Sequence, residues 1–324
     1  MIAVIVPIYN TEKYLRETID SVICQTLSFA EHIRLILLDD ASTDGSFAIC
    51  EQYQKQYPKQ ILVKHYDTNQ GVSALRNEGV RIAGEMGDEL ITFLDSDDKL
   101  ADDAMEKANF ESHEDISVAA IAVKYFGTRD GEQRLNWRFQ EMDVVDIKKQ
   151  YTFPHYYVGG VFLRKRVLNE LHFDETMNFW EDALAINQVI VSEGKYGLIQ
   201  DTFYFYRKRE DESSLVDTAW HKKERYTTLL SSGYGQLFAY SRKKHHRIIP
   251  YVQYMVAYHM RLMMMKSKQS IIEEILSEEE LAALRDDVQK VLKKIKVKYI
   301  LQIPTSLPII EGMLSMRAGK QVRA

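Results

Sequence analysis

An apolar run leads directly into three carboxylic acids, Asp95, Asp97 and Asp98, in the stretch ITFLDSDDKL. Acids this close repel one another unless a cation, an arginine or water lies among them. One interpretation is a strand end followed by a helix start, where the helix dipole favours acids. The other is a site for Mg²⁺ or Mn²⁺, which take one or two protein carboxylates and complete their coordination with water and substrate phosphates. On the second interpretation, the ligand carries a diphosphate.

Two further acids, Glu181 and Asp182, stand at the start of a helical pattern in the stretch FWEDALAINQVI. Acids in a first helical turn are stabilised by roughly 0.3–1 kcal/mol each through the helix dipole, which is a sufficient structural reason for them. A catalytic reason is also available, because a carboxylate that takes a proton from an attacking hydroxyl typically contributes about 10²- to 10⁴-fold in rate. Both interpretations stay open on these residues alone.

The first hundred residues alternate between two periods, and these predict the elements that position the acids. Apolar runs rich in β-branched residues occupy residues 3–8, 34–38, 61–65 and 90–94. Helical-period segments lie between them, at about residues 13–25, 46–57 and 72–83. Strand–helix–strand units of this length form a parallel sheet with helices on both faces. We therefore expect an α/β fold.

Polar residues follow each of the predicted strands, at residues 7–10, 39–44, 67–69 and 95–98. The carboxyl ends of parallel strands meet at one edge of a sheet, and ligands bind in the loops beyond that edge. Helix capping or a strand end explains each loop singly, but it does not explain why the acids and amides of all four gather at one edge. We expect a binding site there.

The pattern changes in the second half of the chain. Strands are predicted at residues 116–126 and 157–163, and a helix begins near Glu181, which indicates a mixed, partly antiparallel continuation of the sheet. Beyond about residue 218 the pattern is mostly helical. The Met-rich stretch MVAYHMRLMMMK in that region is typical of a packed helix face, because Met side chains fill irregular cores.

Composition excludes some classes of protein. A net charge of −5 and a pI near 6.0 argue against a nucleic-acid-binding protein, which needs a dominant basic face. The two cysteines, Cys24 and Cys50, lie in apolar-periodic segments and are expected to be buried thiols in a reducing compartment. Neither a signal peptide nor a run of about 18 apolar residues is evident, so we expect a cytoplasmic protein.

The last segment mixes Lys and Arg with apolar residues, and Pro304 and Pro308 prevent it from forming one continuous helix. Three interpretations are open for it: packing against the rest of the chain, a partner surface, or a peripheral contact with the inner face of the membrane. The sequence also leaves open a homodimer through the C-terminal helices.

Five motifs occur in an order that resembles family 2 glycosyltransferases with the GT-A fold. They are VPIYN at residues 6–10, LLDDASTDGS at 37–46, NQGVSALRNEG at 69–79, FLDSDD at 93–98 and WED at 180–182. The resemblance covers about residues 1–215. It implies a GT-A catalytic domain at residues 1–217, with a nucleotide-sugar-binding half at 1–98 and an acceptor half at 99–217. A mainly helical C-terminal region would follow at residues 218–324.

The resemblance implies a donor site in the first half. The residues implied to contact the donor nucleotide are Pro7, Tyr9, Asn10, Asp40, Asn69, Arg76, Asp95 and Ser96. Among them, Asp40 would bond the edge of the base and Asp95 the ribose. Asp97 would bind a Mn²⁺ or Mg²⁺ cofactor on the donor diphosphate. Asp98 is a second metal candidate, because family members differ in which acid of this run touches the cation.

It also implies a catalytic and acceptor site. Asp182 would be the general base, beside Glu181, and Gly159 and Gly160 would lie near the acceptor. A downstream segment is implied to close over the diphosphate, and its candidate residues are Arg207, Arg209, Ser213 and Ser214. The sequence does not decide which arginine faces the phosphates.

The implied function is an inverting transfer of a sugar from a nucleotide sugar, a UDP-sugar, to a hydroxyl during synthesis of a bacterial surface polysaccharide or teichoic acid. The acceptor would be a glycan, a polyol phosphate or a lipid-linked molecule at the cytoplasmic face of the membrane. A phosphohydrolase or nucleotidyltransferase is disfavoured, because the first strand ends in Pro-Ile-Tyr-Asn rather than in Asp-x-Asp or a Gly-rich basic loop. The alternative is a catalytically inactive scaffold that binds nucleotide sugars.

Overall fold

The computed structural model describes residues 1–108, 114–209 and 218–320, which fall into two units by their contacts. The first unit comprises residues 1–145, 157–175 and 195–211, and the second comprises residues 146–156, 176–194 and 212–324. The predicted domain boundary between residues 217 and 218 involves residue 217, which lies outside the described residues, so that boundary stays a prediction.

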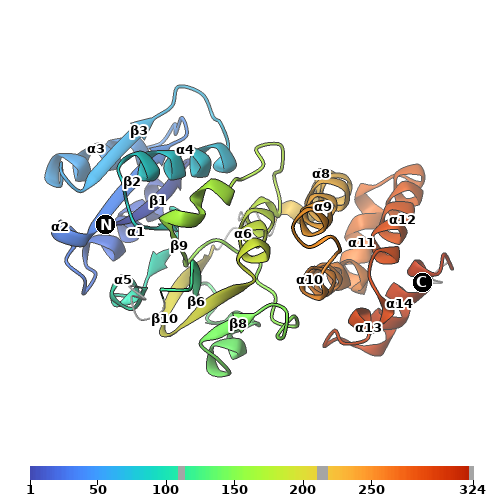
Figure 1. Cartoon of the computed structure of the whole chain (residues 1–324). Coiled ribbons are helices and arrows are strands. Elements are labelled where there is room, and N and C mark those ends of the chain that lie inside the picture. The colour runs from blue at the N-terminus through green and yellow to red at the C-terminus, as the bar shows by residue number, and fades with distance from the viewer. Residues whose placement is uncertain (109–113, 210–217, 321–324) are drawn as a thin grey trace. The chain divides into compact units, whose positions relative to one another are not determined.

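Within the described residues, ten strands form one mixed sheet (Figure 1). The strands are β1 (Ile2–Ile8), β2 (Ile33–Asp39), β3 (Ile61–His65), β4 (Leu90–Phe93), β5 (Lys99–Leu100), β6 (Val118–Gly127), β7 (Gly131–Glu132), β8 (Val144–Asp146), β9 (Val161–Arg164) and β10 (Lys195–Lys208). Their main order is β3-β2-β1-β4-β9-β6-β10-β5. Strands β1 to β4 pair in parallel, whereas β9 is antiparallel to β4 and β6. The predicted parallel first half and partly antiparallel continuation are confirmed.

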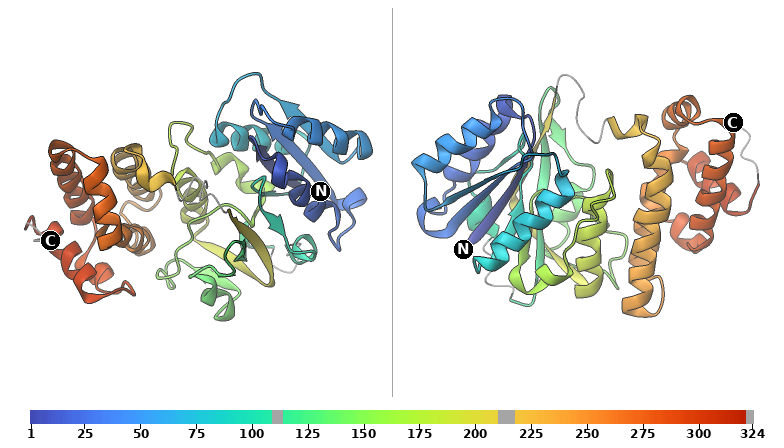
Figure 2. Two further views of the ribbon diagram at one scale, coloured as in Figure 1. Left: turned by 180° about the vertical axis from the view of Figure 1, so that it is seen from behind. Right: turned by 90° about the horizontal axis from the view of Figure 1, so that it is seen from above.

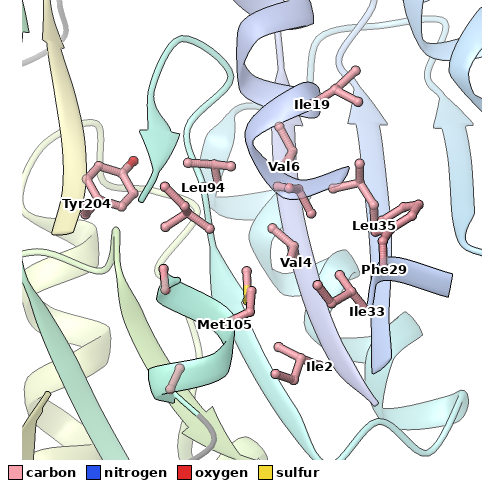
Figure 3. Close-up of a cluster of buried hydrophobic side chains, with 14 of the residues drawn as sticks. Ile2, Val4, Val6, Ile19, Phe29, Ile33, Leu35, Leu94, Met105 and Tyr204 are labelled. Carbon is pink, nitrogen blue, oxygen red and sulfur yellow. The ribbon is translucent and has the colours of Figure 1, made fainter. Parts of the chain in front are cut away.

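Helices cover both faces of the parallel strands. The helices of the first unit are α1 (Glu12–Ile23), α2 (Phe29–His32), α3 (Ser46–Gln56), α4 (Val72–Glu85), α5 (Ala104–Ala108) and the 3₁₀ helices η1 (Asn136–Gln140) and η2 (Lys165–Glu170). On one face, Val4 and Val6 of β1 pack with Ile19 of α1 in the main hydrophobic core (Figure 3). On the other face, α4 lies so close that a Cβ at Gly79 would be 2.3 Å from Cγ2 of Ile5. Because side chains alternate between the two faces of β1, one set packs against α1 and the other set packs against α4.

The elements predicted for the first hundred residues are confirmed, with ends that differ by at most two residues. Strand β6 is likewise found, and β9 begins at Val161, later than predicted. No strand was predicted over β10. Its register against β6 shifts between Ile199 and Phe203, and Asp201 adopts a left-handed φ of 56°. This irregularity interrupts the alternation by which a strand is recognised in a sequence.

The two cysteines are both free, as predicted, but their burial differs. Cys50 of α3 is buried, and burial raises the pKa of its thiol to about 12. The expectation of a buried thiol is wrong for Cys24, which is exposed directly after the last residue of α1. At that position the helix has ended, so its apolar periodicity no longer dictates burial.

The second unit is helical in its described part. Its helices are α6 (Glu181–Glu193), η3 (Ala219–His221), α8 (Glu224–Thr228), the π-helix η4 (Leu229–Tyr234), α9 (Gly235–His245), α10 (Pro250–Met260), η5 (Arg261–Met264), α11 (Lys266–Ile275), α12 (Glu278–Lys293), α13 (Val297–Ile300) and α14 (Leu307–Arg317). Figures 1 and 2 show α8 to α14 gathered together, in orange to red. Met255, Met260 and Met263 are buried, which confirms that the Met-rich stretch packs in a core.

The C-terminal segment is divided as its prolines predict. Helix α13 ends before Pro304, and Pro308 lies in the first turn of α14, where a proline needs no backbone donor. Val297, Leu301 and Leu307 are exposed apolar side chains of this segment. None of the helices in the described part of the chain has the length and apolar character needed to cross a bilayer.

A small ion network ties α4, the helix that carries Arg76, to β3. Glu78 accepts from Lys64 Nζ at 2.6 Å and from Arg81 Nε at 2.7 Å. The hydrogen bonds from Arg81 and then from Lys64 lower the pKa of Glu78 from 4.5 to about 2. Stability from this ionised carboxylate is therefore present above about pH 4.5 and lost as the pH falls toward 2.

We expect Glu78→Gln to lower the free energy of unfolding at pH 7 by about 1 kcal/mol, because the pair is partly exposed. Urea denaturation at several pH values measures this. Glu85→Gln is the matched control, since Glu85 also pairs with Arg81 but is more exposed, and its effect should be near zero. An effect of Glu78→Gln that is as large at pH 2 as at pH 7 would contradict the ionic explanation.

Candidate active site

The loops after β1 and β2 are held together at the carboxyl edge of the sheet. Asn10 has a left-handed φ of 52°, its N–H donates to Ser42 Oγ at 3.0 Å, and its Oδ1 accepts from Thr43 N at 2.8 Å. Tyr9 beside it is 51% exposed, whereas Pro7 is buried inside β1. The structure thus leaves the Tyr9 ring open to a ligand and gives Asn10 a role in fixing the two loops.

Asp40 fixes a third loop, the one between β3 and α4. Its side chain is buried, Oδ1 accepts from Gln70 N at 2.6 Å, and Oδ2 accepts from Gly71 N at 2.9 Å. Asn69 Nδ2 donates to the Asp40 carbonyl at 3.4 Å. Asp40 and Asn69, two predicted donor-site residues, are therefore brought together, with both Asp40 oxygens already accepting backbone N–H groups.

Asp39 was not among the predicted site residues, although it ends β2 at the same edge. It is fully buried, and its Oδ2 lies 2.7 Å from Nδ1 of His65, its register partner on β3. Its Oδ1 is buried and has no hydrogen-bond partner among the described residues. A buried carboxylate oxygen without a donor is a candidate acceptor for an N–H group of a ligand. The pairing of two strand-end residues in adjacent strands is the sequence signal that could have found it.

Two arginines are paired with the closely spaced acids of the stretch ITFLDSDDKL. Asp95 is 39% exposed, and its Oδ1 lies 3.0 Å from Nη2 of the buried Arg76. Asp97 Oδ2 accepts from Nε and Nη2 of Arg209, both at 2.7 Å. Ser96, between the two acids, is buried, and its carbonyl accepts from Thr18 Oγ1. The positive partners of the acids in the chain itself are therefore Arg76 and Arg209.

Asp98 is enclosed by the chain. It is 1% exposed, its Oδ2 accepts from the Tyr204 hydroxyl at 2.7 Å, and its Oδ1 accepts from Arg207 N at 2.7 Å. Burial, and then repulsion from Asp97 and Asp95, raise the pKa of Asp98 well above its ordinary value. Burial also raises the pKa of Asp97, by more than the ion pair with Arg209 lowers it.

The two candidate arginines, Arg207 in β10 and Arg209 directly after it, contact different groups. Arg207 Nε donates to the Asp97 carbonyl at 2.7 Å, and its Nη2 lies 2.5 Å from Glu17. The Arg207 guanidinium also lies over the ring of Phe126, at 4.3 Å from the ring centre. Arg209, by contrast, places its guanidinium on the Asp97 carboxylate. The other two candidates of this segment, Ser213 and Ser214, lie outside the described residues.

The chemistry of the acid run is compatible with a divalent cation, and the role of Asp97 as its ligand stays a prediction. No cluster of three or more His, Cys, Asp or Glu side chains in the described ranges is arranged to hold a metal ion. Mg²⁺ and Mn²⁺ do not need one, since they commonly bind one or two carboxylates and take their other oxygens from water and phosphates. A cation would also relieve the mutual repulsion of the acids. Because Asp98 has both oxygens engaged, a metal role for it stays a prediction.

The glycine pair makes room for Tyr204. A Cβ at Gly159 would lie 2.7 Å from Cζ of Tyr204, and a Cβ at Gly160 would lie 2.9 Å from its Cβ. Gly160 also has a left-handed φ of 69°. These glycines therefore let the Tyr204 hydroxyl reach Asp98, and their predicted place beside the acceptor stays a prediction.

We expect Gly159→Ala to lower the free energy of unfolding by about 1–3 kcal/mol, because the added methyl group overpacks the Tyr204 ring. Chemical denaturation followed by tyrosine and tryptophan fluorescence measures this. Gly84→Ala is the matched control, since a Cβ there meets nothing within 4 Å and a helical alanine should stabilise the chain by about 0.5–1 kcal/mol. Equal effects of the two changes would show that the Tyr204 contact is not what requires Gly159.

Asp182 and Glu181 belong to the second unit, and each is placed there by the start of α6. Trp180, the preceding residue, has a left-handed φ of 69°. Glu181 is buried, whereas Asp182 is half-buried and its Oδ1 accepts from Ala183 N at 2.6 Å. A left-handed conformation is unfavourable for a bulky residue such as tryptophan, and strain of this kind often marks a functional position.

Comparison with known proteins places these features in a family. Residues 3–172 match the family model described as Glycosyl transferase family 2. The minor teichoic acid biosynthesis protein GgaA of Bacillus subtilis (strain 168) is 39% identical over 304 residues, which cover 93% of this chain and 68% of GgaA. The poly(ribitol-phosphate) beta-N-acetylglucosaminyltransferase TarS of Staphylococcus aureus is 28% identical over 215 residues, covering 65% of this chain and 36% of TarS.

Two solved structures share the fold. The structure of S. aureus TarS 1-349 in complex with UDP-GlcNAc has a TM-score of 0.72 at 19% identity, covering 99% of this chain and 93% of that one. The mannosyltransferase PcManGT of Pyrobaculum calidifontis, in complex with GDP-Man and Mn²⁺, has a TM-score of 0.54 at 15% identity and covers 99% and 88% of the two chains. At these identities the likeness concerns the fold, which agrees with the GT-A architecture expected from the sequence.

Proposed function

Because this chain belongs to glycosyl transferase family 2, we propose that it transfers a hexosyl group from a UDP-sugar to a hydroxyl of a teichoic-acid-type polyol phosphate, with inversion at the anomeric carbon. The observation that carries the proposal is the 39% identity to GgaA over 93% of this chain. The gathering of Asp95, Asp97, Arg76 and Arg209 at the carboxyl edge of the sheet supports it, since this is where such sheets bind ligands.

The donor is proposed to bind across the loops after β1 to β4. The exposed Tyr9 ring would lie against the base, and Asp95, oriented by Arg76, would accept hydrogen bonds from the ribose hydroxyls. Asp40 and Asn69 would shape the wall beside the base through their contacts with the loop after β3. Of these proposed residues, Asp40 and Asn69 are held by hydrogen bonds with the backbone, and Asp95 is held by its ion pair with Arg76.

Asp97 would hold a Mn²⁺ or Mg²⁺ ion, which supplies positive charge for the diphosphate that leaves when the sugar is transferred. The chain contributes a second positive charge at the same place through Arg209, whose guanidinium contacts Asp97. A diphosphate presents several oxygens, so it offers a partner to this arginine as well as to the cation.

Asp182 would act as the general base that takes the proton of the acceptor hydroxyl as it attacks the anomeric carbon. Its position in the first turn of α6 favours the ionised carboxylate through the helix dipole. An inverting transfer needs only this one base, because the diphosphate leaves without a protonated acid. A catalytically inactive scaffold would have no use for such a base, which favours the enzyme over that alternative.

The proposed place of action is the cytoplasmic face of the membrane, through a peripheral contact. The exposed apolar side chains Val297, Leu301 and Leu307 lie in a C-terminal segment that also carries Lys and Arg residues, which is the composition of an interfacial contact. The same segment is the proposed surface for a homodimer. Vesicle co-sedimentation tests the membrane contact and sedimentation velocity tests the homodimer. Each measurement is made on the wild type and on a Leu301→Ser/Leu307→Ser variant.

The proposed activity is tested by release of UDP from a panel of UDP-sugars, with Mn²⁺ or Mg²⁺, in the presence of poly(glycerol phosphate) or poly(ribitol phosphate). We expect UDP release that requires the cation and rises with acceptor concentration. Neither hydrolysis nor transfer with any donor, despite donor binding, would favour the scaffold. Transfer to a neutral glycan but to neither polyol phosphate would overturn the proposed acceptor class.

A further inference from the structure

The second unit holds a buried cation that forms no ion pair with any of the described residues. Arg225 of α8 is 3% exposed, and its Nε and Nη1 are buried with no hydrogen-bond partner among the described residues. Burial lowers its pKa to about 10, which leaves the guanidinium charged at neutral pH. Native chains rarely bury a charged group in this way unless something else completes its hydrogen bonds.

The surroundings of Arg225 are aromatic. Its guanidinium carbon lies 3.8 Å from the ring centre of Phe179 and 3.6 Å from that of Trp220. Stacked rings hold the plane of a guanidinium and leave its N–H groups pointing outward along the edge of that plane. The N–H donors of the Arg225 guanidinium are therefore held in one orientation, but the aromatic rings do not provide the hydrogen-bond acceptors that these donors lack.

Other groups near Arg225 add positive charge. One of these groups is the buried Arg261: burial, and then the charges of Arg225 and Arg261, lower the pKa of the half-buried His259 well below its ordinary value, so His259 itself is neutral. Lys268 Nζ lies 4.4 Å from the ring centre of Trp220. A site with this charge favours an anion over a neutral group.

The position of Arg225 connects it with the base. Phe179 and Trp180 come directly before Glu181 and Asp182, and Trp180 Nε1 is a further buried N–H without a partner among the described residues. All the buried side-chain polar atoms without partners in the described part of the second unit are N–H donors of Arg225 and Trp180. An acceptor-rich ligand, with several oxygens, is what such donors lack.

We propose that Arg225, held by Phe179 and Trp220, binds a phosphate group of the acceptor and thereby orients the neighbouring hydroxyl toward Asp182. This inference rests on the proposed function, and it names the residue that would bind the phosphate of the polyol phosphate acceptor. A phosphodiester offers two oxygens to the planar fork of an arginine, which a lysine cannot match. In a polyol phosphate each hydroxyl-bearing unit is flanked by phosphates, so one bound phosphate fixes the position of the next hydroxyl. The donor diphosphate has the same chemistry, and the experiment must distinguish the two.

The test compares Arg225→Met and Arg225→Lys with the wild type and with Arg242→Met. Arg242 is an exposed arginine on α9, so its removal controls for the loss of one charge from the same unit. Isothermal titration calorimetry measures binding of short poly(glycerol phosphate) or poly(ribitol phosphate) oligomers and, separately, of UDP with Mn²⁺. We expect Arg225→Met to weaken binding of the oligomer at least 10-fold, Arg225→Lys to weaken it less, and neither to change UDP binding. Arg242→Met should behave as the wild type.

Thermal unfolding of the same variants separates a binding role from a structural one. Because Nε and Nη1 of Arg225 have no hydrogen-bond partner among the described residues, Arg225→Met should unfold at the same temperature as the wild type or higher. A lowered unfolding temperature with unchanged oligomer affinity would overturn the proposal in favour of a structural cation. Weakened UDP binding with unchanged oligomer binding would assign the arginine to the donor, and no oligomer binding by the wild type would also overturn it. Oligomer binding that depends on Arg225 without any transfer would instead contradict the proposed enzymatic function.

Discussion

Asp182→Asn is expected to lower kcat by about 10²- to 10⁴-fold and to leave the affinity for UDP and Mn²⁺ unchanged, because the amide cannot take a proton from the attacking hydroxyl. The change keeps the size of the side chain, and an asparagine oxygen can still accept the Ala183 N–H that Asp182 Oδ1 accepts. Steady-state rates of acceptor-dependent UDP release, with UDP affinity measured by calorimetry, give the two quantities. A loss in kcat without a loss in donor affinity is what distinguishes a base from a binding residue.

Glu181→Gln is the matched control for this prediction. It removes the neighbouring acid of the same helical turn and so changes the local charge by the same amount. If α6 needed only one negative charge near its start, the two variants would lose the same amount of activity. A kcat of Asp182→Asn close to that of the wild type would mean that another group takes the proton, and the mechanism proposed for Asp182 would fail.

How far the fold could be predicted depended on how regular each strand is. Strands β1, β2 and β4 are apolar runs that are followed within two positions by a polar residue, so their bounds follow from the sequence to within two residues. Strand β10 carries a register shift and a left-handed Asp201, and its side chains do not alternate over its whole length. The sequence pattern therefore did not predict β10, the strand whose Tyr204 and Arg207 contact Asp97 and Asp98.

The sequence identified the acids of the candidate site, but it did not identify the side chains that contact them. Asp95, Asp97 and Asp98 could be placed at a sheet edge because each follows a strand. Their division of roles could not be predicted, because Asp98 is enclosed by Tyr204, 106 positions away, and Asp97 is paired with Arg209, 112 positions away. Asp39 was missed for a similar reason: only the fold places His65 beside one of its oxygens and leaves the other buried without a hydrogen-bond partner among the described residues.

Asp97→Ala is expected to abolish the cation-dependent part of donor binding. In the wild type, UDP at about 100 times its Kd should raise the free energy of unfolding by about 2.7 kcal/mol when the cation is present, by mass action on the folded state. The stabilisation should shrink when EDTA removes the cation. In Asp97→Ala the stabilisation should be small with or without the cation, because the carboxylate proposed to hold it is gone. Thermal shift with UDP, UDP and Mn²⁺, and UDP and EDTA measures all three states.

Two comparisons decide whether Asp97 acts as a ligand or only as a partner for Arg209. Asp98→Asn should keep the Mn²⁺-dependent stabilisation, because both Asp98 oxygens already accept hydrogen bonds from the chain. Arg209→Met removes the ion pair of Asp97 and leaves the carboxylate, so Mn²⁺-dependent stabilisation should persist even if UDP binds more weakly. If Arg209→Met and Asp97→Ala lose the cation dependence equally, the ion pair and not a metal ligand is the function of Asp97. If Asp98→Asn alone loses it, the ligand is Asp98, and Tyr204 must move away from that carboxylate when the donor binds.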